Sequence, residues 1–509
     1  MILGEINRAS GITTTLDDLF RRAGVRHPDA LALVDAPNRQ SFTDGAPRTL
    51  NYAQADHAIS AVSARLRSFG LPTDAVVAMQ LPNTVDSIVA FLGVLRAGMI
   101  AAPVPLLWRR RDMVDALGRV GAKAIVTCAR AGSTAHAEIA MHTAAALFPV
   151  RHIFGFGQDL PDGIVSLDDA FVPGGADLSS TSPRPDAAAA HVAALTFGVD
   201  ARGAIPMARN HVELVSGGLA IVLEGGIAAG AHLMSAIPVS SFAGLALTLM
   251  PWLLSGGTLH LHHGFEPLTF AEQRDTTEFD AMTLPAAALP AMAAAGLLGA
   301  ETLVALWRAP ERMMAAKLIE NTPAVVDVSS FGETGIVAAR RSANGHPLAI
   351  PHGVISVPRG AIGAMTVIET ARSGTGTLLL RGPMIPAAAF PRGADAPHLS
   401  PDRAGYFDTG YACRLDPSTQ TLTITVPPPN IVGIGGYRVR QNDLDACLEK
   451  AATEATAVAL PDRTLGHRLA GAAQDKKAVA AALEEQGANA LISGAFRQRG
   501  AADADADAA

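Results

Sequence analysis

Short apolar runs alternate with amphipathic stretches through the first third of the chain. Val76–Asn83, Ile100–Pro105 and Ala124–Thr127 have the composition of buried strands. Ser87–Ala97, between the first two runs, has a helical pattern that meets a stop signal at Gly98. Alternating strand and helix patterns favour parallel sheets covered by helices. The sequence therefore predicts an α/β fold with doubly wound sheets.

The pattern continues beyond a polar, Pro- and Gly-containing linker. His191–Phe197 reads as a strand, Gly198–Pro206 as a loop, and Val212–Ile221 as a helix. Gly225–Phe265 contains no Asp, Glu, Lys or Arg, but Pro, Ser and Gly residues interrupt it. Its longest clean piece, Phe242–Leu254, is shorter than the ~20 apolar residues of a membrane span. We expect a buried core helix there and no membrane span.

The chain changes character at the proline run Pro427–Pro429. Before it, Thr421–Val426 alternates like a half-buried strand, and after it a short strand at Tyr437–Val439 precedes a helix at Asp443–Lys450. The proline run stiffens the backbone and marks a joint. We expect a core domain over residues 1–426, a cap domain over 427–500, and a disordered Ala/Asp tail over 501–509.

Composition narrows the function classes. The 509 residues carry a net charge of −7 without a Lys/Arg stripe, which argues against nucleic acid as a partner. The three cysteines are far apart and form no CxxC pair, and Met1–Ile6 lacks the basic start of a secretion signal. We therefore expect a reducing compartment, the cytoplasm. His260 and His262 alternate onto one strand face, but no further ligands stand nearby except Glu266, so we expect no metal there.

Several segments resemble the adenylate-forming (AMP-binding) superfamily, which includes acyl-CoA synthetases, luciferases and peptide-synthetase adenylation domains. Gly405–Gly410 (GYFDTG) and Gly435–Val439 (GGYRV) are similar to its core-to-cap junction, Phe331–Thr334 (FGET) to its Y-G-x-T-E turn, and Gly376–Pro383 (GTLLLRGP) to a strand motif before that junction. The resemblance implies a large N-terminal core of two parallel-rich sheets with helices, a small β-barrel-like subdomain, and a small α+β C-terminal cap.

The resemblance also implies a chemistry and a site. Such enzymes activate a small carboxylic acid with ATP and Mg, and acyl-CoA synthetases then pass the acyl group to CoA. Glu333 and Thr334 take the catalytic positions, with Glu333 also the metal ligand. The implied cofactor-binding residues are Thr196, Gly198, Arg202, Gly203, Phe331, Gly332 and Tyr411. The implied substrate-binding residues are His211, Ser240, Phe242, Gly244 and Ser330.

Five positions depart from the family pattern. The phosphate-loop Lys is absent from the expected loop at 198–206, where Arg202 or Arg209 is the candidate replacement. Gly335 stands at the metal-binding Glu, Tyr411 at the ribose-binding Asp, and Pro427 at the hinge Arg. The terminal catalytic Lys has no counterpart. Each missing group screens phosphate charge, holds Mg or grips the nucleotide, so its loss weakens the expected chemistry.

Two hypotheses follow. The chain is either an ATP-dependent acyl-CoA synthetase with altered chemistry, or a non-catalytic paralogue that binds an acyl ligand or regulates a partner. The expected partner is a small carboxylic acid, with a carrier protein, an active paralogue or a second copy of the chain as alternatives. The proline run predicts a stiffer hinge, and less rotation of the cap, than the family pattern implies.

Overall fold

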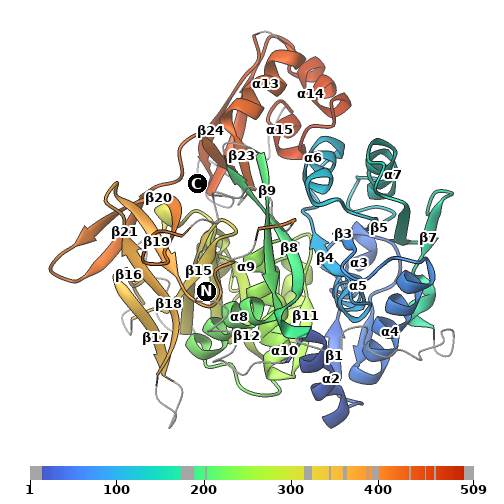
Figure 1. Ribbon diagram of the computed structural model, residues 1–509, viewed down its shortest axis with the longest axis horizontal. Helices are drawn as coiled ribbons and strands as arrows, with labels where there is room; N and C mark the ends of the chain where they lie inside the picture. Colours follow the sequence, from blue (N-terminus) through green and yellow to red (C-terminus); the bar gives the residue numbers. More distant parts are fainter. Residues whose placement is uncertain are drawn as a thin grey trace.

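The computed structural model describes residues 14–172, 188–200, 203–313, 324–342, 345–358, 364–386, 389–391, 401–434, 437–452, 454–462 and 466–497. The chain forms three sheet-based units with a small C-terminal unit above them (Figure 1). The predicted tail at 501–509 lies outside the described residues.

The first sheet has seven strands and is parallel except for its last pair. Its central strands are completely buried, which explains why they read as continuous apolar runs. In order along the sheet, the strands are β7 (Ile164–Ser166), β6 (His152–Phe156), β5 (Ala124–Cys128), β3 (Val76–Gln80), β4 (Ile100–Pro103), β8 (Val192–Asp200) and β9 (Gly203–Asn210).

Helix α4 (Tyr52–Ser68) leads from the second sheet into this one, and α5 (Val85–Arg96), α6 (Arg110–Val120) and α7 (His136–Ala146) connect its strands. A capping box starts α4, in which the Asn51 side chain accepts from the backbone N–H of Gln54, and the Gln54 side chain accepts from that of Asn51. The predicted helix at Ser87–Ala97 is confirmed as α5.

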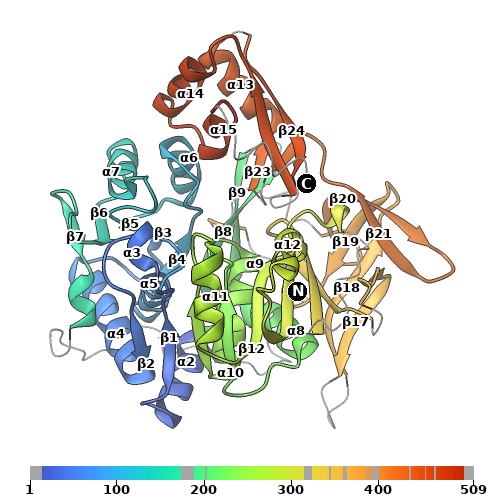
Figure 2. The ribbon, with the colours of Figure 1, turned by 180° about the vertical axis from the view of Figure 1, so that it is seen from behind.

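The second sheet has eight strands, parallel in the middle and antiparallel at both edges. In order, they are β15 (Gly335–Arg340), β14 (Ala324–Phe331), β13 (Ala300–Trp307), β12 (Phe279–Pro285), β10 (His232–Ser235), β11 (Thr258–Leu261), β1 (Leu31–Val34) and β2 (Thr49–Asn51). The helices associated with it are α2 (Leu16–Arg26), α3 (Arg39–Phe42), α8 (His211–Gly225), α9 (Phe242–Gly244), α10 (Met250–Ser255), α11 (Pro267–Asp275) and α12 (Leu289–Ala294). Seen from behind, α11 and α12 lie in front of β12 (Figure 2).

The apolar piece of the charge-free stretch, at 242–254, forms a buried helix, as predicted. A π-helical turn, Leu245–Leu249, joins α9 to α10, and nearly every side chain of the three pieces is buried. Helix α8 packs directly on it, because a Cβ at Gly217 would lie 2.8 Å from the Phe242 ring and one at Gly218 would overlap Met250. Within the described residues, no helix combines the length and apolarity that crossing a membrane requires.

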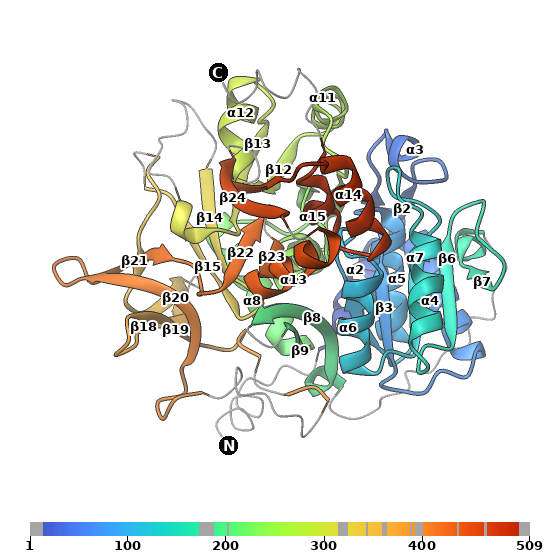
Figure 3. The ribbon, with the colours of Figure 1, turned by 90° about the horizontal axis from the view of Figure 1, so that it is seen from above.

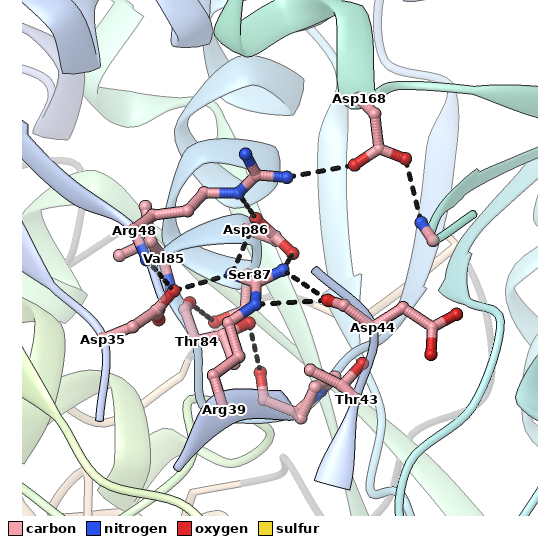
Figure 4. Close-up of polar contacts among 12 residues, drawn as sticks. Asp35, Arg39, Thr43, Asp44, Arg48, Thr84, Val85, Asp86, Ser87 and Asp168 are labelled. Atoms are coloured by element: carbon pink, nitrogen blue, oxygen red, sulfur yellow. Dashed lines mark hydrogen bonds and ion pairs between the residues drawn. The ribbon is translucent and has the colours of Figure 1, made fainter. Parts of the chain in front are cut away.

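A buried ion network ties the two large sheets together (Figure 4). Arg39 of α3 is 1% exposed and donates to Asp35, which follows β1, at 2.6 Å, and also to Asp86 of α5. Arg48 donates to Asp86 at 2.8 Å and to Asp168 at 3.0 Å. Burial raises the pKa of Asp35, against the opposing effect of Arg39. Because β1 belongs to the second sheet and α5 to the first, the shared arginines fix one sheet against the other.

The third unit is a six-stranded antiparallel sheet. Its strands, in order, are β16 (Ile350–Pro351), β21 (Thr421–Val426), β20 (Phe407–Asp416), β19 (Thr377–Arg381), β18 (Ala364–Arg372) and β17 (Gly353–Pro358). The predicted strand at Thr421–Val426 is confirmed as β21. The second half of the GYFDTG motif belongs to β20, where Phe407 pairs with Leu380.

The C-terminal unit, residues 431–497, is called the cap below. It consists of β22 (Ile431–Ile434), β23 (Tyr437–Arg440), α13 (Gln441–Ala451), β24 (Thr456–Asp462), β25 (Gly466–Ala472), α14 (Lys476–Glu485) and α15 (Ala490–Gly494). Seen from above, the cap lies over the region where the first and second sheets meet (Figure 3).

Two backbone contacts dock the cap on the first sheet's side. The N–H of Ala490 donates to the Leu107 carbonyl, and the N–H of Arg111 donates to the Gly487 carbonyl, each at 3.4 Å. The Arg111 side chain also contacts the Sγ of Cys447. Strand β23 lies against β8, which brings the cap to the site described next.

Candidate functional site

The segment expected to form a phosphate loop is a β-hairpin. Strands β8 and β9 pair antiparallel, with Gly198 opposite Ile205, Val199 opposite Ala204 and Asp200 opposite Gly203. The prediction of a loop at 198–206 was therefore wrong. A phosphate cradle needs backbone N–H groups that curl around an anion, whereas this backbone is extended and paired. Arg202, the candidate for the missing Lys, lies outside the described residues.

One face of the hairpin carries the site. Ala194 pairs with Arg209 and Thr196 with Met207, so Thr196, Gly198 and Arg209 share a face. That face meets the turn after β14, because a Cβ at Gly198 would lie 3.8 Å from the Cβ of Glu333.

Arg209 is the buried cation behind this turn. It is 1% exposed, its guanidinium carbon lies 3.6 Å from the Phe242 ring centroid, and its Nη2 donates to the carbonyls of Glu333 and Thr334, the latter at 3.0 Å. Its Nε and Nη1 have no partner among the described residues, and neither does the buried hydroxyl of Thr196. Burial lowers the pKa of Arg209 to about 10, although Glu333 and Glu213 oppose this shift.

The Glu333 carboxylate is held by the chain itself. Its Oε2 accepts the backbone N–H of Phe242 at 2.6 Å, at the start of α9. Among the residues that the structure describes, no group of three or more His, Cys, Asp and Glu side chains is arranged to bind a metal ion. The role of Glu333 as a metal ligand therefore stays a prediction.

Burial and neighbouring groups keep the histidines near β11 uncharged. Desolvation lowers the pKa of His260 to about 4, helped by His232, and lowers the pKa of His263 to about 4, helped by His262. His262 Nδ1 lies 3.0 Å from Gln273 Oε1. These contacts fit side chains packed at the end of a sheet.

The cap closes the site from above with Arg438. This side chain donates to the Tyr411 hydroxyl and lies over Gly332, where a Cβ would come within 2.6 Å of its Nη1. Burial lowers the pKa of Arg438 to about 10, against the effects of Glu333 and Glu311. Tyr411 is 1% exposed and meets the Phe331 ring edge-on at 5.3 Å between centroids. Tyr411 and Arg438 thus fill the space between β14 and the cap.

A cavity of about 70 Å³ remains between the hairpin, the Glu333 turn and the cap. It is lined by Pro105, Trp108, Phe197, Gly198, Val199, Ser240, Ser241, Arg308, Ser330, Gly332, Glu333, Tyr437 and Arg438. Arg308 follows β13 and forms no hydrogen bond or ion pair with the rest of the described chain. The site is therefore small and polar and carries two guanidinium groups on its wall.

The family model described as "AMP-binding enzyme" matches residues 20–198. Apo MbtA from Mycobacterium smegmatis has the same fold, with a TM-score of 0.63 and 22% identity over 96% of this chain and 92% of that chain. These two likenesses bear out the resemblance to the adenylate-forming superfamily at the level of the fold.

Segments of the chain are also similar to two larger proteins. It is 33% identical over 103 residues to the bassianolide nonribosomal cyclodepsipeptide synthetase of Beauveria bassiana, and 32% identical over 122 residues to human long-chain fatty acid transport protein 1. The matched segments cover 20% and 24% of this chain, but only 3% and 18% of those relatives. A fused adenylation–PCP di-domain from Klebsiella oxytoca shares the fold, with a TM-score of 0.67 and 13% identity over 94% of this chain and 92% of that one.

The adenylate-forming fold brings most of the predicted site residues together. Five of them line the cavity: Gly198, Ser240, Ser330, Gly332 and Glu333. Five others lie next to the cavity, as the contacts described above show: Thr196, Phe242, Phe331, Thr334 and Tyr411. Their roles toward a nucleotide or an acid stay predictions.

Three of the predicted site residues, His211, Gly244 and Gly203, contact other parts of the chain and not the cavity. His211 Nδ1 accepts the backbone N–H of Leu16 at 3.2 Å, so this ring joins α8 to α2. Gly244 packs against the Pro238 carbonyl so closely that a Cβ would overlap it, and a Cβ at Gly203 would lie 2.9 Å from the Arg119 guanidinium. None of the three lines the cavity.

Sequence reasoning missed Arg308 and Arg438. Arg438 is the variable residue of the GGYRV motif, so the motif gave no reason to single it out. Arg308 follows a parallel strand, and ligands of open α/β sheets bind at the carboxyl ends of such strands. Its position directly after this strand was the signal that could have marked Arg308 as a site residue.

Proposed function

We propose that this chain is a non-adenylating member of the adenylate-forming superfamily. It binds a ligand between core and cap and works through a partner protein, in the cytoplasm. The β8–β9 hairpin is the observation that carries this proposal, because a paired, extended backbone replaces the loop that would cradle the phosphates of ATP.

The small space left around the hairpin also argues against ATP binding. Tyr411 and Arg438 occupy it with protein atoms, and the remaining cavity measures about 70 Å³. Pockets that enclose a drug-sized ligand are usually ~300 Å³ or larger. A nucleotide would therefore require the cap to leave and the Tyr411 side chain to move.

The acyl side of the site is also filled. Phe242 and Met250 of the buried helix pack directly on α8 at Gly217 and Gly218. This packing favours a small polar ligand over a long acyl chain.

The alternative is an ATP-dependent acyl-CoA synthetase with altered chemistry. The unpartnered N–H groups of Arg209 and the hydroxyl of Thr196, next to Glu333, favour it, because buried polar groups without partners are common at functional sites. CoA or a carrier protein would then accept the acyl group. The fold shared with an adenylation–PCP di-domain supports a carrier protein as the partner in either case.

ATP–pyrophosphate exchange with a panel of carboxylic acids separates the two. We expect no exchange above the protein-free background with any acid. Exchange that disappears in both Glu333→Gln and Arg209→Gln, and persists in the exposed control Arg26→Gln, would instead establish the synthetase.

A further inference from the structure

Two arginines from different parts of the chain meet at the wall of the cavity. Arg308 belongs to the core and has no hydrogen bond or ion pair in the described part of the chain. Arg438 belongs to the cap, and within the described residues its side chain hydrogen-bonds the neutral Tyr411 hydroxyl, with Glu333 and Glu311 as nearby negative charges. Neither arginine forms an ion pair with a carboxylate of the described residues, and a partly buried guanidinium group that lacks a bonded anion is energetically unfavourable.

The charges on the cavity wall favour an anion. Its lining holds two positive side chains, Arg308 and Arg438, and one negative one, Glu333. The Glu333 carboxylate already accepts the Phe242 N–H, and Arg209 stands directly behind its backbone. Ser240, Ser241 and Ser330 add hydroxyl groups to the same wall. Guanidinium and hydroxyl donors around one space are the groups that recognise carboxylate and phosphate oxygens.

The size of the cavity limits the ligand. A volume of about 70 Å³ holds on the order of five water-sized atoms. Acetate and inorganic phosphate fit this limit, and a nucleotide does not.

We propose that the cavity binds a small oxyanion, a carboxylate or phosphate of about four or five heavy atoms, between Arg308 of the core and Arg438 of the cap. This inference rests on the proposed function, because it assigns the ligand of the same site. Since one arginine comes from each side, the bound anion also holds the cap on the core.

Calorimetric titration of the full chain tests the proposal with two separate ligands, sodium phosphate and sodium acetate, at matched ionic strength. We expect a Kd of about 1 mM or tighter for at least one of them. The titration that gives a heat of binding shows whether the site prefers a phosphate or a carboxylate. Arg308→Gln breaks no contact in the described structure, so it should fold normally and weaken binding at least about tenfold.

Further variants sharpen the test. Arg438→Gln should weaken binding similarly, Arg308→Lys should restore part of it, and the exposed control Arg26→Gln should leave it unchanged. The anion should also raise the Tm of the wild type but not of Arg308→Gln. No heat with either anion up to about 20 mM, from folded protein, would overturn the proposal. Equal heat in the wild type and in both Gln variants would overturn it as well.

The outcomes also separate this inference from the proposed function. If neither an anion nor Mg-ATP binds, the proposed oxyanion site is refuted and the proposed function stands. If Mg-ATP binds and the anions do not, both the oxyanion site and the proposed function are refuted.

Discussion

Gly198 faces Ile205 as its partner in the β8–β9 hairpin. This pairing decides how the site differs from the expectation drawn from the family, because it converts a ligand-binding loop into the edge of a sheet. The same hairpin face presents Thr196 and Arg209 toward the Glu333 turn. The β8–β9 hairpin therefore changes both the backbone and the arrangement of site residues from those that the family resemblance implies.

The close packing of α8 on the buried helix makes a sharp stability prediction. Gly218→Ala should destabilise the protein by about 1–3 kcal/mol, since a Cβ there would overlap Met250. Gly118→Ala in α6 is the matched control, because its Cβ would meet only Leu147 at 3.4 Å. That substitution should be neutral or stabilising by up to about 1 kcal/mol. Urea unfolding measures both, and similar values for the two variants would refute the packing described for α8.

The buried ion network predicts a larger effect. Arg39→Met leaves Asp35 and Asp86 without their shared cation, and should cost about 3–5 kcal/mol in the free energy of unfolding. Arg26→Met, on an exposed helix end, should stay within about 0.5 kcal/mol of the wild type. Thermal or urea unfolding gives the comparison. If Arg39→Met were as stable as Arg26→Met, the network would not be joining the two sheets.

The sequence predicted the architecture well for physical reasons. Strands such as β3 are buried on both faces and read as apolar runs, while capping signals such as Asn51–Gln54 mark the start of a helix. The β8–β9 hairpin was missed because Gly198, Gly203 and Pro206 all read as loop residues. Pro206 is tolerated because β9 is the edge strand of its sheet, where a missing N–H is not needed for a further partner.

The site could be predicted only in part. Motif positions such as Glu333 and Ser330 do converge, because the fold brings the strand ends together. The closure by Tyr411 and Arg438 depends on how the cap docks, which no local pattern encodes. The proposed roles of Arg308 and Arg438 rest on side chains that form no ion pair within the described residues, and a sequence does not show this.

Buried histidines predict how stability depends on pH. The pKa of His136 is lowered to about 3, and those of His260 and His263 to about 4, mainly by burial. Below pH ~6.5 the unfolded chain binds protons on these rings that the folded chain does not bind, so stability is lost as pH falls from about 6.5 toward 4. Each ring contributes a slope of up to about 1.4 kcal/mol per pH unit.

Urea unfolding between pH 7 and pH 4.5 measures this slope. His260→Gln should flatten the profile relative to the wild type, while substitution of His27, which lies just after α2 and is exposed, should not. Identical slopes for all three proteins would contradict the assignment of neutral, buried rings.

The proline run predicts a cap that stays docked. Pro428 packs against β20, where a Cβ at Gly410 would lie 3.3 Å from its Cβ. Single-molecule distances between dyes on the core and on α14 should therefore change little when Mg-ATP or carboxylic acids are added. Replacing Pro427–Pro429 with glycines should broaden the distances. A large, ligand-driven swing in the wild type would contradict a stiff hinge.

The central claim is that this protein does not bind ATP, and calorimetric titration of the folded protein with Mg-ATP tests it most directly. It requires no choice of acid or acceptor. We predict no heat of binding up to millimolar ATP, in the wild type and in Arg209→Gln alike. Binding in the micromolar range that Arg209→Gln or Glu333→Gln abolishes would contradict the claim and show a nucleotide site rebuilt around the hairpin.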